Sequence, residues 1–312
     1  LYLDYSLGFA NFNNWKGATS DNKTKWKYSY GETSEYVLFG DWQTCFQVYA
    51  DLYNAQPDET KIARALDVME YQMSTPNIDY WWWVDGLYMV MPVMTRLYKI
   101  TNNPLYLEKL HQYWQYANSI MYDSETGLYF RDKNYVYPAH QTNSGKKDFW
   151  ARGNGWVFAA FARVLSDLPK TDQYRDTYIL YFNRMAEKLA ESQQNEGYWT
   201  RSILDPEYVP GYETSGTAFF AYGFLWGINN GYLSDEKYGQ TARKAWQYLA
   251  SIALQESGKV GYVQPIGASA VPGQVISINS TADFGVGAFL LAATEMYKYT
   301  GGNTSLNKLR LY

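Results

Sequence analysis

The sequence predicts an all-α protein, an (α/α)6 barrel of inner and outer helices. Three observations predict it. Helical segments alternate between a kind that is apolar on almost every face and a kind that is amphipathic and charged. The connections between them repeat, with glycine-plus-aromatic segments at a period of about 45 to 70 residues. No series of short alternating runs with hairpin turns is present, so the signal for strands is weak.

The apolar segments predict the inner ring, because a helix that is apolar all round is buried. Residues 153–168, 215–228 and 283–299 have this character and open with small or glycine-rich stretches. We expect five inner helices, whose first turns gather at one end of the barrel and which begin near Asp41, Asp85, Gly153, Ser215 and Asp283.

The amphipathic segments predict the outer, half-solvated ring. They lie at residues 60–73, 105–121, 174–194 and 236–255. Residues 1–14 open like the segment at 105, so we interpret them as a further outer helix whose inner partner, the first inner helix, is missing from this chain. Counting that helix gives six inner helices, and we expect residues 1–312 to form a single catalytic barrel domain.

The composition favours a carbohydrate ligand over other partners. Aromatic residues make up 19% of the sequence, with 32 Tyr and 12 Trp, and aromatic faces stack on sugar rings. The net charge of -4 argues against nucleic acid as a partner, and no stretch reaches the ~18 apolar residues of a membrane span. In an acidic protein, an anionic ligand needs a local cation.

Cysteine and histidine are too scarce for common metal sites. Cys45 is the one cysteine, and we expect it to be a buried small hydrophobe rather than a nucleophile. The two histidines, His111 and His140, do not suffice for a histidine-rich site. We therefore expect no metal and no cofactor.

Acidic residues recur at the predicted starts of the inner helices, beside aromatic residues. Each could simply cap its helix, because a carboxylate suits the free N–H groups and the dipole there. Enzymes that act on glycosidic bonds also commonly use a pair of carboxyl groups, set here among aromatic side chains. Asp85 follows Tyr80-Trp-Trp-Trp83-Val, which could desolvate it and favour its protonated form, so it is the candidate acid, with Asp41 as its partner.

A second constellation could hold the sugar. In Phe149-Trp-Ala-Arg-Gly-Asn-Gly-Trp156, Arg152 stands between Trp150 and Trp156 and could bind a carboxylate in bidentate fashion, or could pair with a barrel acid. His140 lies in a loop and could either reach the site or stay exposed. The predicted contacts to sugar are Trp42, Trp83, Trp150, Arg152, Asn154, Trp156 and His140.

Several blocks resemble the unsaturated uronyl hydrolases, glycoside hydrolase families 88 and 105, over nearly the whole chain. The blocks favour family 105, the unsaturated rhamnogalacturonyl hydrolases. They are residues 40–47, 82–89 (Trp-Trp-Val-Asp-Gly-Leu-Tyr-Met), 149–156, 212–217 (Tyr-Glu-Thr-Ser-Gly-Thr) and 285–292.

This resemblance implies a bacterial enzyme, periplasmic or cytoplasmic, that removes a terminal 4,5-unsaturated uronate from pectin-type oligosaccharides. Asp85 would protonate C4 of the double bond and assist water to add at C5. Asp41 would be the second carboxylate of the site. Better-known members carry a histidine where this chain has Arg131-Asp132, and His140 comes several residues later.

Other functions fit the same fold. A sugar 2-epimerase is expected to depend on histidine bases, of which the chain has few. A polysaccharide lyase needs a base beside a charge-neutralising group, and tyrosine is abundant. A carbohydrate-binding barrel without activity is the non-enzymatic alternative, against which the retention of Asp41 and Asp85 speaks.

Overall fold

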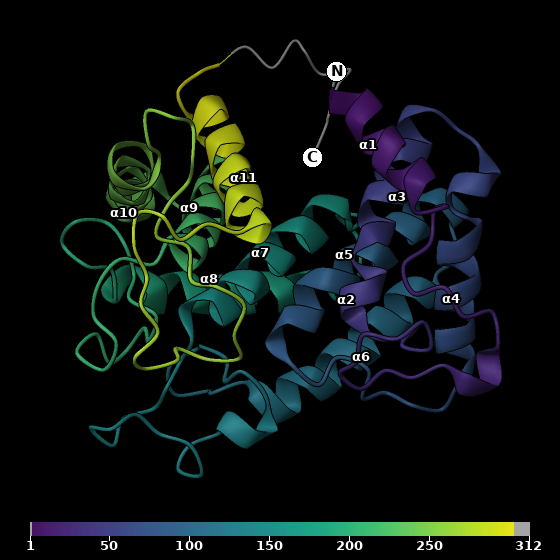
Figure 1. Cartoon of the computed structure of the whole chain (residues 1–312), viewed down its shortest axis with the longest axis horizontal. Coiled ribbons are helices and arrows are strands. Elements are labelled where there is room, and N and C mark those ends of the chain that lie inside the picture. The colour runs from purple at the N-terminus through teal and green to yellow at the C-terminus, as the bar shows by residue number, and fades with distance from the viewer. Residues whose placement is uncertain (1, 303–312) are drawn as a thin grey trace. The chain divides into compact units, whose positions relative to one another are not determined.

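The computed structural model describes residues 2–302, in which all regular secondary structure is helical. This part of the chain divides into two compact units, residues 2–119 with 166–170, and residues 120–165 with 171–302. The α-helices, in chain order, are α1 (Tyr2–Phe12), α2 (Gly40–Gln43), α3 (Cys45–Ala55), α4 (Ala63–Ser74), α5 (Val84–Thr101), α6 (Leu105–Met121), α7 (Ala151–Asp167), α8 (Arg175–Glu191), α9 (Thr214–Asn229), α10 (Asp235–Tyr248) and α11 (Asp283–Tyr299) (Figure 1).

In the first unit, the buried helix α5 packs on α2 and α3. Residues 90–97 of α5 lie in the core, as expected for an inner helix. Its one buried arginine, Arg96, forms an ion pair with Asp51 of α3, with 2.8 Å between Nε and Oδ1. Cys45 is half-buried, and burial raises the pKa of its thiol to about 11, so it is a poor nucleophile at neutral pH.

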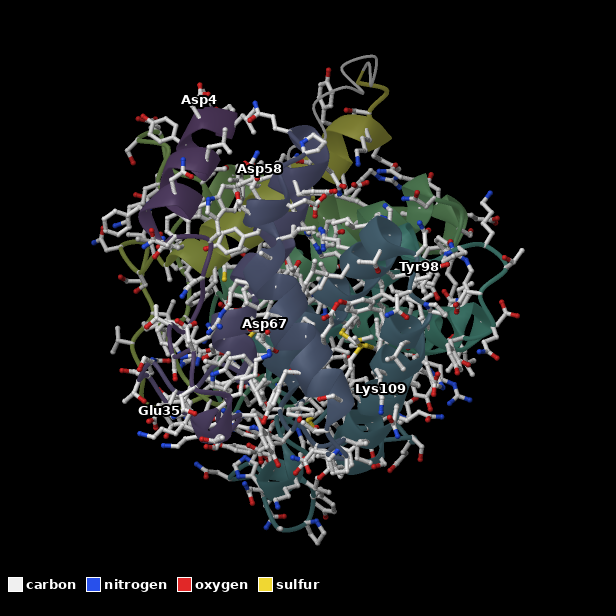
Figure 2. All side chains as sticks on the ribbon, turned by 90° about the vertical axis from the view of Figure 1, so that its right-hand side faces the viewer. Asp4, Glu35, Asp58, Asp67, Tyr98 and Lys109 are labelled. Atoms are coloured by element: carbon white, nitrogen blue, oxygen red, sulfur yellow. The ribbon has the colours of Figure 1, made fainter. Side chains whose placement is uncertain are left out.

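The outer helices α4 and α6 of this unit present charged residues to solvent. Asp67 of α4 and Lys109 of α6 are visible at the surface (Figure 2), whereas Val68 and Met69 of α4 are fully buried. One apolar and one charged face is the pattern that the sequence predicts for the outer ring.

Helix α1 exposes aromatic side chains to solvent. It contacts α3, where Ala10 is buried, but a stripe of aromatic side chains at helical spacing stays exposed. These are Tyr2, Tyr5, Phe9 and Phe12. The predicted missing inner helix stays a prediction.

In the second unit, α9 is the central element. It packs against α10 and α11, and its residues 214–227 are all buried. Helix α7 is buried over almost its whole length. The predicted inner helices near Gly153 and Ser215 are therefore confirmed, as are the amphipathic segments that became α8 and α10. A π-helical turn, Leu249–Ala253, continues α10.

Helix α11 differs from the prediction. Its sequence is apolar, so we expected burial all round, yet Leu290 is 58% exposed and Tyr297 54% exposed. One face, with Phe289 and Ala292, packs on the unit, while no element within residues 2–302 covers Leu290. An apolar composition indicates that a helix can be buried; whether each face is covered depends on its neighbours.

Among residues 2–302, no helix is both long enough and apolar enough to span a bilayer.

Candidate functional site

The first turns of α2 and α5 meet on one indole ring, that of Trp83. Its Cη2 atom lies 3.0 Å from the place where a Cβ on Gly40 would stand, and 3.2 Å from the corresponding place on Gly86. Asp41 follows the first glycine and Asp85 precedes the second. Only glycine allows the ring to come so close to both backbones. The structure thus brings the two predicted catalytic carboxylates to neighbouring helix starts in the same unit.

The surroundings of the pair are aromatic. Trp83 is 3% exposed and stacks on Phe39, with ring centroids 4.7 Å apart, and its other neighbour is the Trp82 ring, also at 4.7 Å. The Trp42 indole is held by a hydrogen bond from Nε1 to Gly31 O. Asp41 is exposed and Asp85 is half-buried, with its Oδ1 atom out of contact with solvent.

Position along the helix gives these acids a defined electrostatic setting. The N-cap residues of α2 and α5 are Phe39 and Trp83, and neither side chain makes a capping hydrogen bond. Asp41 and Asp85 stand in the first turn of their helices, beside the free backbone N–H groups of that turn. A partly accessible acid beside apolar rings, rather than a fully buried cap, can take part in proton transfer.

In the second unit, Trp150 and Arg152 are fixed by residue Gln264. Trp150 Nε1 donates to Gln264 Oε1 at 2.8 Å. Arg152 is 3% exposed and donates to Gln264 O at 2.7 Å, Pro265 O at 2.9 Å and Ser215 Oγ at 3.3 Å. Its guanidinium lies between the rings of Trp150 and Phe284, 4.6 Å from each centroid. These contacts hold a loop in place.

Asn154 also bonds to backbone. It is 1% exposed, accepts from Tyr129 N at 2.8 Å and donates to Tyr129 O at 2.9 Å, as one amide pairing with another. This geometry favours a positioning role, and a contact to sugar stays a prediction. Trp156 is half-buried, with its ring 4.3 Å from that of Phe219.

His140 is tied to a buried acid. Its Nε2 lies 3.0 Å from Asp148 Oδ2, and the other oxygen of Asp148 accepts from Ser202 Oγ at 2.8 Å. The imidazole is tilted by 58° against the Tyr135 ring, with 4.6 Å between the ring centroids, and the His140 side chain is 30% exposed. The loop histidine is thus oriented, with one edge accessible.

Glu213 differs from the other helix-start acids, because it is a true cap. It is fully buried and accepts from Ser215 N at 2.9 Å and Gly216 N at 2.7 Å, which satisfies the free N–H groups of α9. It also accepts from Gln264 N at 3.2 Å. The structural interpretation therefore holds for this residue.

Gln264 is the residue that the sequence interpretation missed. It is fully buried and connects Trp150, Arg152 and Glu213. A signal was present, because it is the last residue of the repeated segment Gly261-Tyr-Val-Gln264. Its partners, however, lie more than a hundred residues away along the chain for Trp150 and Arg152.

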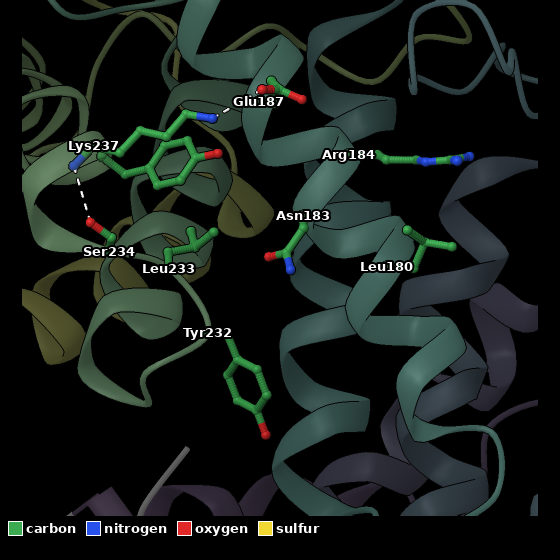
Figure 3. Close-up of a pocket in the computed structure, with 9 residues that line it drawn as sticks. Leu180, Asn183, Arg184, Glu187, Tyr232, Leu233, Ser234 and Lys237 are labelled. Atoms are coloured by element: carbon green, nitrogen blue, oxygen red, sulfur yellow. Dashed lines mark hydrogen bonds and ion pairs between the residues drawn. The ribbon is translucent and has the colours of Figure 1, made fainter.

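A separate pocket of about 320 Å³ lies between α8 and the start of α10 (Figure 3). Asn183, Tyr232 and Lys237 are among its lining residues, and Lys237 pairs with Glu187 at 2.9 Å. None of the predicted site residues lines it, so we assign it no part in catalysis.

Comparison with known proteins identifies the family. The profile of Glycosyl Hydrolase Family 88 matches residues 2–300. The chain belongs to this family. A relative named "Unsaturated 3S-rhamnoglycuronyl hydrolase", from Formosa agariphila, is 40% identical over 222 residues, which are 70% of this chain and 58% of that protein. The family 88 chain therefore spans a little more than half the length of that relative.

Two solved structures are similar over nearly the whole chain. A family 88 glycosyl hydrolase from Bacteroides vulgatus is 63% identical, with a TM-score of 0.94 over 96% of this chain and 86% of that one. A structure described as a polysaccharide lyase is 65% identical, also with a TM-score of 0.94, over 97% and 85% of the two chains. The likeness confirms the helical-barrel fold class that the sequence predicts.

Proposed function

We propose that this family 88 protein removes a terminal 4,5-unsaturated uronic acid from an oligosaccharide. The observation that carries the proposal is the placement of Asp41 and Asp85 at two helix starts that share the Trp83 ring. Family membership and the name of the Formosa relative support it.

In the proposed reaction, the carboxylic acid of Asp85 gives its proton to C4 of the C4=C5 double bond. Water then adds at C5 and returns a proton to the Asp85 carboxylate, so the group is restored. The hemiketal formed at C5 opens, and the glycosidic bond breaks. Asp41 supplies the second carboxylate, while Trp83 limits the access of bulk water to Asp85.

The residues of the second unit are proposed to contact the saccharide. Trp150 and Trp156 offer aromatic faces, and His140 offers an oriented imidazole edge. Arg152 and Asn154 act by shaping this surface, since their polar atoms bind backbone.

For the substrate, we propose rhamnose as the sugar next to the uronate. The Formosa relative's name contains a rhamnoglycuronyl group, and the sequence blocks resemble those of family 105, whose members act on rhamnogalacturonan fragments. A pectin-type oligosaccharide with an unsaturated end is accordingly the substrate to test first. The proposed location, the periplasm or cytoplasm of a bacterium, rests on the resemblance alone.

A lyase is the second candidate, because one structure at 65% identity is described as a polysaccharide lyase. The two activities change the same chromophore in opposite directions. A lyase creates the C4=C5 double bond and a hydrolase of this type consumes it.

The deciding experiment follows the ultraviolet absorbance of the unsaturated uronate. With lyase-generated rhamnogalacturonan disaccharide, the absorbance should fall as the protein acts. With intact polysaccharide, it should stay constant. A rise with intact polysaccharide would replace the proposal by the lyase, and no change in either assay would refute both for these substrates.

A further inference from the structure

Arg201 is a buried cation that the proposed reaction does not yet use. It is 7% exposed and belongs to the extended stretch that runs beside the start of α7. Its carbonyl accepts from Ala151 N at 2.8 Å, and Ile203 N donates to Phe149 O at 2.9 Å. Arg201 therefore sits next to the turn that presents Trp150 to the proposed saccharide.

The guanidinium of Arg201 has little to bind within the described residues. Its one hydrogen bond there runs from Nη1 to Val271 O, at 2.9 Å, and no carboxylate of residues 2–302 forms an ion pair with it. Two of the other buried arginines have more partners. Arg152 donates to three oxygens, and Arg96 has the carboxylate of Asp51.

Such a placement leaves the cation without a counter-charge among the described residues, while its unbonded donors are not among the fully buried atoms. Burial lowers the pKa of the Arg201 guanidinium, and the more distant charge of Glu213 opposes that shift. A buried cation is normally paired with an anion, and most of the N–H donors of this one have no acceptor from the described protein. A bound anion would supply both the charge and the acceptors.

We infer that Arg201 binds the carboxylate of the uronate, an assignment that rests on the proposed function for its choice of ligand. The planar fork of an arginine matches a carboxylate in bidentate geometry. Arg152 and Arg201 both bond to the loop at residues 264–271, and we assign them different roles. Arg152 fixes its beginning at Gln264 and Pro265, and the bond to Val271 orients Arg201 while leaving its other donors for the sugar.

The test compares Arg201→Gln with Arg201→Lys and with the control Arg96→Gln. Melting temperature is measured alone, with D-galacturonate and with D-galactose, which lacks the carboxylate. The wild type should be stabilised by galacturonate and not by galactose. Arg201→Gln should lose that shift without melting lower than the wild type, because it removes an unpaired buried charge. Arg201→Lys should keep part of the shift.

Arg96→Gln should melt lower, since it leaves Asp51 without its partner, and should keep the galacturonate shift. With the unsaturated disaccharide, Arg201→Gln should raise KM about 10- to 100-fold, as expected for the loss of a hydrogen-bonded charge, with a smaller effect on kcat.

Three results would overturn the assignment. One is a wild type that galacturonate does not stabilise. Another is an Arg201→Gln variant that melts well below wild type yet keeps the galacturonate shift, which would make Arg201 a structural clamp. The third is a shift with inorganic sulfate, but not galacturonate, that depends on Arg201, which would assign it to a sulfate ester. Binding of galacturonate through Arg201 without any cleavage would refute only the proposed reaction.

Discussion

Glu213 and Asp85 both stand at the start of a buried helix, but their surroundings differ in every other respect. Glu213 is fully buried, and its two oxygens accept hydrogen bonds from Ser215, Gly216 and Gln264. Asp85 is the second residue of its helix, two positions after the Trp83 cap, and is half-buried. The same residue class at the same kind of place thus serves as a structural cap in one unit and as a candidate acid in the other.

The hydrogen-bond partners of each acid, rather than its position in the helix, therefore distinguish a structural cap from a candidate catalytic acid. The carboxylate oxygens of Glu213 are occupied by three backbone N–H groups and the Ser215 hydroxyl, so they are not available to a substrate. An acid that is partly accessible beside apolar rings can exchange protons with a substrate.

The largest effect is expected for Asp85→Asn. The change preserves shape and removes the proton, so kcat for the unsaturated disaccharide should fall about 10²- to 10⁴-fold, while the melting temperature stays near that of wild type. Absorbance kinetics and thermal denaturation measure the two. Near-normal turnover by this variant would end the assignment of Asp85.

Glu213→Ala should lower the stability of the protein, in contrast to the loss of kcat expected for Asp85→Asn. Removing the cap leaves the N–H groups of Ser215, Gly216 and Gln264 without an acceptor, so the free energy of unfolding should fall by about 2 to 4 kcal/mol. Urea denaturation followed by circular dichroism measures it. Glu213→Gln is the matched variant and should lose less, because its carbonyl oxygen can still accept. An unchanged stability in Glu213→Ala would contradict the cap.

Gly86→Ala probes the Trp83 ring with a smaller change. The new Cβ would stand 3.1 Å from ring atom Cζ3, so the ring must shift by a few tenths of an ångström. Since a displacement of about 1 Å can cost about 10²-fold in rate, kcat should fall severalfold. Alanine favours the helix by about 0.5 to 1 kcal/mol, which offsets part of the strain. Gly287→Ala on α11, where a Cβ meets nothing within 4 Å, is the control and should leave kcat unchanged.

The smallest effect concerns a third acid, Asp205, and depends on pH. Burial tends to raise the pKa of its carboxyl, but hydrogen bonds from Ser144, Thr142 and Lys146 outweigh burial and hold the pKa below its ordinary value. A lowered pKa contributes stability above the unfolded value, ~4, that is lost as the pH falls through the folded value. Asp205→Asn should therefore be less stable than wild type at pH 7, and the gap should narrow below about pH 4. A gap that is constant with pH would contradict the ionised state.

The sequence alone determined the helical class and the start of each inner helix to within about two residues, because hydrophobic period and first-turn residues are local properties. Asp41 and Asp85 could be predicted as a pair because both open predicted inner helices, and the structure brings the starts of α2 and α5 together within one unit. The sequence also contains the glycines beside them, Gly40 and Gly86, but gives no reason for them. The reason is that the Trp83 ring packs against both glycines in the folded protein.

Only the tertiary structure decided which polar groups are already satisfied. For Arg152 the sequence left open a ligand carboxylate or a structural partner; two of its hydrogen bonds reach carbonyls 112 and 113 residues further along the chain, and no local pattern encodes such partners. The same holds for the bonds of Gln264 to Trp150, Arg152 and Glu213, and for α11, whose apolar face stays exposed within residues 2–302. Period and composition state what a segment can bury, whereas hydrogen-bond partners and covered faces depend on which distant segments the fold brings beside it.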